Sequence, residues 1–253
     1  MKIEGFIVHL QRAKARRVQV EHLLAATPVK TRVLDAVDGQ AIANEELARY
    51  AGKALHEPAY PFVLRKSEIA CFLSHRKAWR MIVEEGLDAG LIIEDDVALD
   101  AALFPRCLEM AERACKGKAY VQFRISRIRG NFRDVLRDDE IRLVAPDVTQ
   151  LGTVAQLVTR EAAAHLLDLT ERFDRPVDTF LQMRWVTGIV PQCVVPSGVS
   201  DQSSEIGGST ISASGKTESS AGERLKREWN RFVYRRQVRK RSRDHLQAGM
   251  ERF

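Results

Sequence analysis

The chain has 253 residues, of which 45% are hydrophobic and 29% charged, so it can bury a sizeable core and is neither a membrane protein nor a disordered one. Its net charge is +6, but the segment from Gly215 onward holds 12 Lys or Arg against five Asp or Glu, a surplus of +7 that leaves −1 for the body. The four cysteines form no CxxC pair, and no signal pattern or long apolar span precedes the first strand, which predicts reduced thiols and a location on the cytoplasmic side.

The first part of the chain predicts a strand, a helix and a second strand, at residues 3–10, 11–24 and 30–37. The second strand ends in Asp38-Gly39, a turn signal. This order indicates a βαβ unit with a parallel sheet. Residues 45–63 contain two prolines and are expected to form a surface loop or short helices. Three arginines stand near the start of the first helix: Arg12, Arg16 and Arg17.

Residues 67–85 give the clearest helical pattern, with Ser67 as the expected N-cap and Gly86 as the stop. Its apolar stripe consists of Ile69, Phe72, Leu73, Trp79, Ile82 and Val83. His75 lies between Phe72 and Trp79 on the helical wheel, so it is either a satisfied core histidine or part of a site. Arg76 projects from within the stripe and is expected to extend to the surface. Ser74 falls on the opposite face without an evident partner.

A short apolar run at residues 90–93 predicts a buried strand that leads directly into Glu94, Asp95 and Asp96. A strand interior does not tolerate three adjacent charges, so we expect the chain to leave the sheet at Glu94. The carboxyl edge of a parallel sheet is where ligands bind in α/β proteins, and clustered carboxylates suit Mg²⁺ or Mn²⁺. A solvated acidic turn is the alternative, and this stretch alone does not decide between them.

The elements after the acidic stretch are predicted in chain order: a helix at 100–116, a strand at 120–125, an exposed hairpin or loop at 127–139, strands at 141–144 and 153–159, helices at 160–169 and 175–185, and a strand at 189–195. The Ser- and Gly-rich segment 197–220 predicts a mobile loop or linker. No internal repeat is visible.

Residues 221–245 predict a basic helix with a small apolar face of Leu225, Trp229, Phe232 and Val233. A cationic run follows: Arg235, Arg236, Arg239, Lys240, Arg241 and Arg243. Aromatic side chains next to many cations suit an anionic membrane surface, which we rank first. Nucleic acid is the competing partner, and a solvated tail without a partner is the third interpretation.

Several segments together resemble glycosyltransferase family 25, the lipopolysaccharide and lipooligosaccharide sugar transferases related to collagen galactosyltransferases. The resemblance covers roughly residues 1–212. It is carried by residues 7–10 with Arg12, Arg16 and Arg17, by residues 36–39, by 67–75 with Trp79, by 91–97, and by Gly152-Thr153, 162–167 and 175–178. The chain departs from the family pattern at His9, Ser67, Ala70, Arg76 and Gln156.

The resemblance implies one α/β domain of the GT-A-like type over residues 1–212, with a mostly parallel central sheet flanked by helices, a linker at 213–220 and a basic helical tail at 221–253. It implies inverting transfer of a sugar from a UDP-sugar, most often UDP-galactose, to a saccharide or lipid-linked saccharide acceptor. It also implies that residues 94–96 are equivalent to the DxD metal motif. If the acceptor is lipid-linked, the basic tail would hold the protein at the inner face of the cytoplasmic membrane, where such an acceptor lies.

The residue roles follow from what this reaction needs. Asp96 is expected to bind Mn²⁺ or Mg²⁺ directly, with Glu94 beside it, and Glu94 and Asp95 to contact the ribose, the second shell or the metal's waters. The donor is expected to lie along the first strand and the next turn, against Leu10, Arg12, Val37, Asp38, Gly39 and His75, with Arg17 as a further diphosphate contact. Asp178 is the candidate base, and Asp201 and Glu205 are its rivals in a loop that could close over the site.

Two other classes remain open. A metal-dependent phosphoryl-transfer enzyme would also use clustered acids, but it predicts a second acidic cluster. The remaining acids of this kind are Asp134, Asp138, Asp139 and Glu140, in a polar segment without a preceding strand. In a non-catalytic binding protein, these acids would be surface residues without a catalytic role.

Overall fold

An eight-stranded sheet in the order β2-β1-β3-β8-β5-β9-β7-β6 forms the centre of the computed structural model, which describes residues 1–204 and 221–250. Its strands are β1 Ile3–His9, β2 Thr31–Asp35, β3 Ala89–Glu94, β5 Tyr120–Phe123, β6 Phe132–Asp138, β7 Ile141–Pro146, β8 Ala155–Thr159 and β9 Gln192–Val195. A two-stranded sheet pairs β4 Val97–Leu99 with β10 Val199–Asp201.

Most strands of the large sheet run in one direction. β1 is parallel to β2 and β3, and β5 is parallel to β9, while β8 is antiparallel to both β3 and β5. Only β7 and β8 run opposite to the other six of these strands. The predicted α/β class with a mostly parallel sheet is therefore confirmed, and the carboxyl ends of β1, β2, β3, β5 and β9 share one edge.

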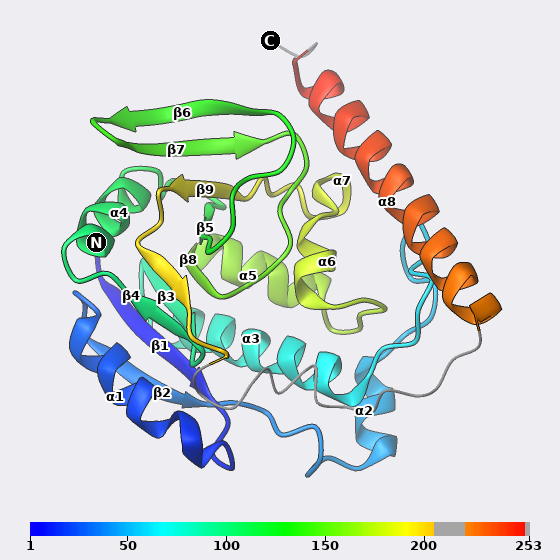
Figure 1. Ribbon diagram of the computed structural model, residues 1–253, viewed down its shortest axis with the longest axis horizontal. Helices are drawn as coiled ribbons and strands as arrows, with labels where there is room; N and C mark the ends of the chain where they lie inside the picture. The colour runs from blue at the N-terminus through cyan, green and yellow to red at the C-terminus, as the bar shows by residue number, and fades with distance from the viewer. Residues whose placement is uncertain (205–220, 251–253) are drawn as a thin grey trace.

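Helices cover both faces of this sheet (Figure 1). They are α1 Arg17–Ala26 with the preceding 3-10 turn η1 Lys14–Arg16, α2 Asn44–Tyr50, α3 Lys66–Glu84, α4 Leu103–Glu112, α5 Arg160–Leu169, α6 Val177–Leu181, α7 Arg184–Thr187 and α8 Ala221–Met250. Alternate strand residues point to opposite faces. Phe6 and Ile92 therefore pack with α3, α5 and α6, whereas Ile7 and Leu91 pack with α1 and α4.

The first turn of α3 differs from the sequence prediction. Arg65, not Ser67, is the N-cap, and its backbone N–H donates to the side chain of Glu68 over 2.8 Å. The long helix nevertheless ends as predicted, because Gly86 follows it at φ +60°. Arg76 does not extend to the surface: it is buried and donates to the Leu167 carbonyl and to the Thr170 hydroxyl.

Three other helix boundaries differ from the predictions. The helix expected at residues 11–24 begins only after the 3-10 turn η1, and the one expected at 100–116 is the shorter α4. The segment 175–185 forms two short helices, since the backbone of Met183 leaves the helical region (ψ 63°) while its side chain is fully buried. Two other predictions are confirmed: the segment 45–63 contains the short helix α2, and the polar segment after β5 forms strand β6 of a hairpin with β7.

Helix α8 confirms the predicted helical tail and packs against the body. Its buried face consists of Tyr234, Val238 and Ser242, and the Tyr234 hydroxyl accepts a hydrogen bond of 2.9 Å from the buried Arg175 guanidinium. The predicted linker 213–220 lies outside the described residues. All four cysteines are free, and among the described helices none is long and apolar enough to cross a membrane.

Candidate functional site

The acidic stretch lies where the sequence predicts it, in the turn between β3 and β4 at the carboxyl edge of the sheet. Strand β3 is buried up to Ile93. At its end, the backbone N–H of Glu94 donates a hydrogen bond to the carbonyl of Val154, the residue just before β8. The turn is then held to β10 by a 2.8 Å hydrogen bond from Gln202 N–H to the Asp96 carbonyl. The chain therefore turns away from the sheet as its charged residues begin.

Asp95 is buried and fully engaged within the protein. Its Oδ1 is 2.5 Å from the Arg16 guanidinium, and its Oδ2 is 2.6 Å from Nδ1 of His9. Both partners are themselves buried. Asp95 therefore fixes the start of α1 and the end of β1 to the acidic turn, and its oxygens are already occupied.

Asp96 has the least compensated charge of the three acids. Its nearest cationic contact is the same Arg16 guanidinium, at 3.3 Å. Burial raises the pKa of Asp96 to about 6, and the negative charges of Glu94, Asp95 and Asp201 raise it as well, although Arg16 acts in the opposite direction. A partly buried carboxylate among like charges is what a divalent cation would stabilise.

Glu94 is held by a hydroxyl and an imidazole. It accepts a 2.8 Å hydrogen bond from the Thr153 hydroxyl, and Nε2 of His75 lies 3.5 Å from the same oxygen. Burial raises its pKa, but the contacts from His75 and Thr153 outweigh this effect and the net pKa is lowered. Glu94 is therefore ionised at neutral pH.

A buried polar chain orients His75. Tyr120 donates to Oε1 of Gln156 over 2.9 Å, and Nε2 of Gln156 lies 3.3 Å from Nδ1 of His75. Because the amide nitrogen can only donate, this geometry assigns the acceptor role to Nδ1 and the ring hydrogen to Nε2, which faces Glu94. His75 is buried, as the sequence predicts, and lies at the site.

Asp178 approaches from the first turn of α6. It accepts backbone N–H groups of Gly152 over 3.1 Å and of Thr179 over 2.6 Å. Gly152 has φ +100°, a conformation that L-residues other than glycine rarely adopt. Burial raises the pKa of Asp178, and the charge of Glu94 raises it further. The two carboxylates therefore interact across the site.

The predicted donor-binding residues lie at the same edge, at the ends of β1 and β2. Arg12 Nε donates to Asp38 over 2.8 Å, and Val37 N–H donates to the Ser74 hydroxyl over 2.8 Å. Leu10 follows β1 directly, and a Cβ added at Gly39 would lie 2.7 Å from the Lys66 carbonyl oxygen. The prediction that Ser74 lacks a partner is wrong, because its buried side chain ties this turn to α3.

The remaining candidates are exposed or lie outside the described residues. Asp201 ends β10 and is exposed, and hydrogen bonds from Ser203 lower its pKa. Arg17 is exposed in the first turn of α1. Glu205 lies outside the described residues. The sequence-based assignment gave no role in the site to Arg16, His9 or Thr153. Each of them bonds to Asp95 or Glu94 at least 59 residues away in the chain, and such a contact leaves no periodic signal in the local sequence.

The donor atoms at the site fit a hard divalent cation. Cys71, His75 and Glu94 offer ligand atoms within 4.8 Å of one another. Burial and the nearby acids raise the pKa of the Cys71 thiol well above its ordinary value, so without a cation this thiol stays protonated. The carboxylates of Asp96 and Glu94 remain, and oxygen donors of this kind suit Mg²⁺ or Mn²⁺.

Comparison with known proteins identifies the relatives of this chain. Residues 2–181 match the family model described as "Glycosyltransferase family 25 (LPS biosynthesis protein)". The chain is 27% identical over 193 residues to "Procollagen galactosyltransferase 2" of Mus musculus, which covers 72% of this chain and 30% of that protein. It is 34% identical over 101 residues to "Probable inactive glycosyltransferase 25 family member 3" of Rattus norvegicus, covering 38% and 18% respectively.

The chain thus spans less than a third of the length of these two relatives. Among solved structures, a glycosyltransferase involved in glycosylation of the major capsid of PBCV-1 aligns over 67% of this chain and 65% of its own, with 11% identity and a TM-score of 0.32.

The raised pKa of Asp96 predicts how stability depends on pH without a divalent cation. The folded state holds the Asp96 proton more tightly than the unfolded chain does, so ionising Asp96 lowers stability as pH rises from about 4 to about 6. Asp96→Asn removes this cost and should make the protein more stable than wild type at about pH 7.5, by about 1–3 kcal/mol, with a smaller advantage at about pH 5. Urea unfolding in EDTA at both pH values measures the difference. An advantage that does not shrink at the lower pH would contradict the prediction.

Proposed function

The chain belongs to glycosyltransferase family 25, and from this premise we propose that it is an inverting, metal-dependent enzyme that transfers a sugar from a UDP-sugar to a saccharide acceptor of lipopolysaccharide or lipooligosaccharide. Galactose is the proposed sugar, in keeping with the named activity of the relative from Mus musculus. The single observation that carries the proposal is that the adjacent residues Gly152 and Thr153 bond to Asp178 and Glu94 respectively, which brings Asp178 to the acidic turn of Glu94 and Asp96 at the carboxyl edge of the sheet.

The donor is proposed to lie across the ends of β1, β2 and β3. Arg12, Asp38 and the backbone around Gly39 would bind its nucleoside and diphosphate, and Asp96 with Glu94 would hold Mn²⁺ or Mg²⁺. A bound cation of this kind neutralises the charge that gathers on the departing diphosphate. Asp95 supports this arrangement indirectly, because its salt bridge fixes Arg16 beside Asp96.

Asp178 is the proposed general base. An acceptor hydroxyl oxygen bonds to the anomeric carbon while the bond from that carbon to the diphosphate oxygen breaks, and the electron pair leaves with UDP. The hydroxyl proton passes to the carboxylate of Asp178, whose raised pKa makes it a better base than an ordinary surface aspartate. The rival Asp201 is exposed and has a lowered pKa, which makes it a weaker base.

The phosphoryl-transfer alternative loses support from the geometry of its second acidic cluster. Asp138 is 2.7 Å from Arg113, Glu140 is 2.7 Å from Arg106, and Asp134 is 3.7 Å from Arg142. These acids lie on the exposed β6–β7 hairpin and are paired with arginines, so they offer no second metal site. The relative from Rattus norvegicus is named as a probable inactive member of the family, so family membership does not exclude the non-catalytic alternative. Assays of UDP binding and of sugar transfer decide between the two.

The basic tail is proposed to dock on an anionic membrane. At 100° per residue, the exposed side chains of Leu225, Trp229 and Phe232 form a stripe opposite to the buried face of Tyr234, Val238 and Ser242. Exposed cations continue this stripe along the helix: Arg236, Arg239, Lys240 and Arg243. One face of α8 is therefore held by the body, while the opposite face presents aromatic rings followed by positive charge.

Asp96→Ala should abolish Mn²⁺-dependent binding of UDP and lower transfer from UDP-galactose to a lactose-terminated acceptor by at least about 100-fold, because the cation loses its main ligand. Calorimetry with UDP and Mn²⁺ and a transfer assay measure these effects. Asp139→Ala, on the exposed hairpin, is the matched control and should behave as wild type. Full activity of Asp96→Ala would remove the metal assignment.

Asp178→Asn should bind UDP and Mn²⁺ normally but transfer sugar about 10² to 10⁴ times more slowly, since the amide cannot accept the proton. Single-turnover transfer rates measure the effect, with Asp201→Asn as the control that should retain the rate. A loss of rate in Asp201→Asn without one in Asp178→Asn would assign the base to the other residue.

The double variant Trp229→Ala and Phe232→Ala should weaken binding to phosphatidylglycerol vesicles by about tenfold or more, because two exposed rings no longer enter the interface. Vesicle sedimentation measures binding, which added salt should also weaken. Phe132→Ala, an exposed aromatic on β6, is the control. Equal vesicle binding by the double variant and wild type would reject membrane docking by α8.

A further inference from the structure

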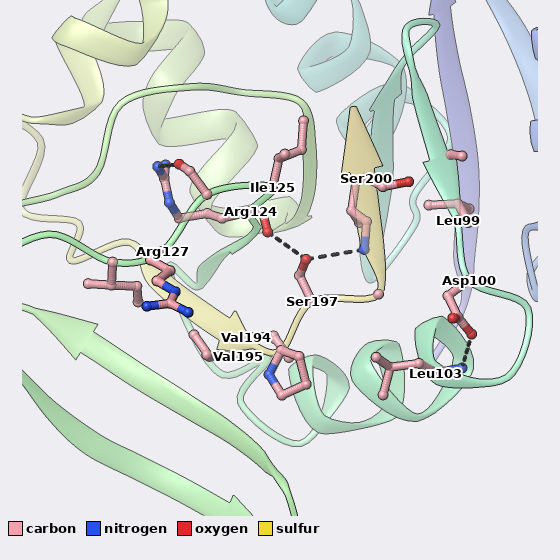
Figure 2. A pocket seen from close by; sticks show the side chains of 16 residues that line it. Leu99, Asp100, Leu103, Arg124, Ile125, Arg127, Val194, Val195, Ser197 and Ser200 are labelled. Atoms are coloured by element: carbon pink, nitrogen blue, oxygen red, sulfur yellow. Dashed lines mark hydrogen bonds between the residues drawn. The ribbon is translucent and has the colours of Figure 1, made fainter. Parts of the chain in front are cut away.

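A pocket of about 540 Å³ lies at the same edge of the sheet as the acidic cluster but over β5 and β9. Its walls come from the segments that follow these two strands, from the β4–β10 sheet and from the start of α4 (Figure 2). The Ser197 hydroxyl ties the segments together, since it donates to the Arg124 carbonyl over 2.6 Å and accepts the Val199 N–H over 3.2 Å. The pocket is therefore held open by the fold.

This pocket borders the acidic cluster on two sides. Ala98 of β4 and Ser200 of β10 line the pocket and are paired with each other. The next pair along these two strands, Val97 with Asp201, lies beside the Asp96 turn. On the other side, Arg124 donates to the Leu151 carbonyl, and the next residue, Gly152, donates to Asp178. In the strand order, the acidic cluster on β3 thus separates the proposed donor site over β2 and β1 from the pocket over β5 and β9.

The pocket combines two arginines with apolar side chains. Arg124 and Arg127 lie on one wall, and Leu99 and Leu103 lie on the opposite side (Figure 2). Among the described residues, neither arginine forms a salt bridge, but they differ in access: Arg124 donates to the Leu151 carbonyl and, over 2.9 Å, to the Ser126 hydroxyl, whereas the Arg127 side chain is exposed. The one acid of the lining, Asp100, already accepts the N–H groups of Ala102 and Leu103.

We infer that this pocket is the acceptor subsite and that it takes a saccharide bearing an anionic group, either a phosphate ester or a carboxylate. The position opposite the donor half is the one from which an acceptor must attack in an inverting reaction. Arg127 would bind the anion through charge-assisted hydrogen bonds, the positive charge of Arg124 would favour an anion at this wall, and the apolar wall would pack against the sugar ring. The inference rests on the proposed function, because an acceptor implies a transferase.

The test compares three probes by calorimetry or by saturation-transfer NMR: glucose 6-phosphate, glucuronate and neutral glucose. Wild type should bind at least one of the anionic sugars more tightly than glucose by about tenfold or more, and Arg127→Gln should remove this difference. Preference for glucose 6-phosphate would identify a phosphate ester as the group recognised, and preference for glucuronate a carboxylate. Arg127 is exposed, so its replacement should leave the fold intact, which circular dichroism checks.

Arg129→Gln is the matched control, because Arg129 is exposed on the same segment but does not line the pocket. It should retain the preference for the anionic sugar. Equal affinity for charged and neutral sugars, no binding of any of them, or the same preference in Arg127→Gln would overturn the inference. Mn²⁺-dependent UDP binding is measured separately, so that a protein binding the anionic sugar but not UDP would refute the transferase and the acceptor role, and would leave only the binding of an anionic sugar in this pocket.

Discussion

The structure depends on how the protein holds several carboxylates close together at the end of a buried strand. Glu94, Asp95 and Asp96 follow β3 without a break, and Asp178 approaches them from α6. Their charges are compensated unequally. Asp95 has an arginine and a histidine, Glu94 has a hydroxyl and an imidazole, and Asp96 shares Arg16 with Asp95. This inequality separates a structural acid from acids that remain available to a ligand.

The same inequality explains the position of the surrounding elements. Arg16 and His9 anchor α1 and β1 to the acidic turn through Asp95, so the half of the site proposed for the donor is fixed by a buried ion pair. His75 and Thr153 bring α3 and the segment before β8 to Glu94. A change in any of these residues would act through the orientation of a carboxylate rather than through direct contact with a substrate.

Sequence patterns were sufficient where the determinants are local. The apolar run before Glu94 predicted the buried strand and its end, and the stripe in residues 67–85 predicted α3 with His75 directed inward. Long-range partners were not predictable. Arg16 and Asp95 are 79 residues apart, and Ser74 and Val37 are 37 apart, so neither pair leaves a periodic signal. The N-cap of α3 was misassigned because the cap consists of the Glu68 carboxylate accepting the backbone N–H of Arg65, and arginine is a residue type that is rarely an N-cap.

The buried guanidinium of Arg175 has a consequence for how the chain can be shortened. It bonds to Asp174, to the His56 and Pro58 carbonyls, and to the Tyr234 hydroxyl of α8, only three residues before Asp178. A truncated protein that ends before Tyr234 would leave part of a buried cation without its phenol partner at the base of α6. The tail and the proposed base Asp178 are thus anchored through the same residue, Arg175. A fragment shortened to improve solubility would therefore differ from the intact chain close to the proposed base.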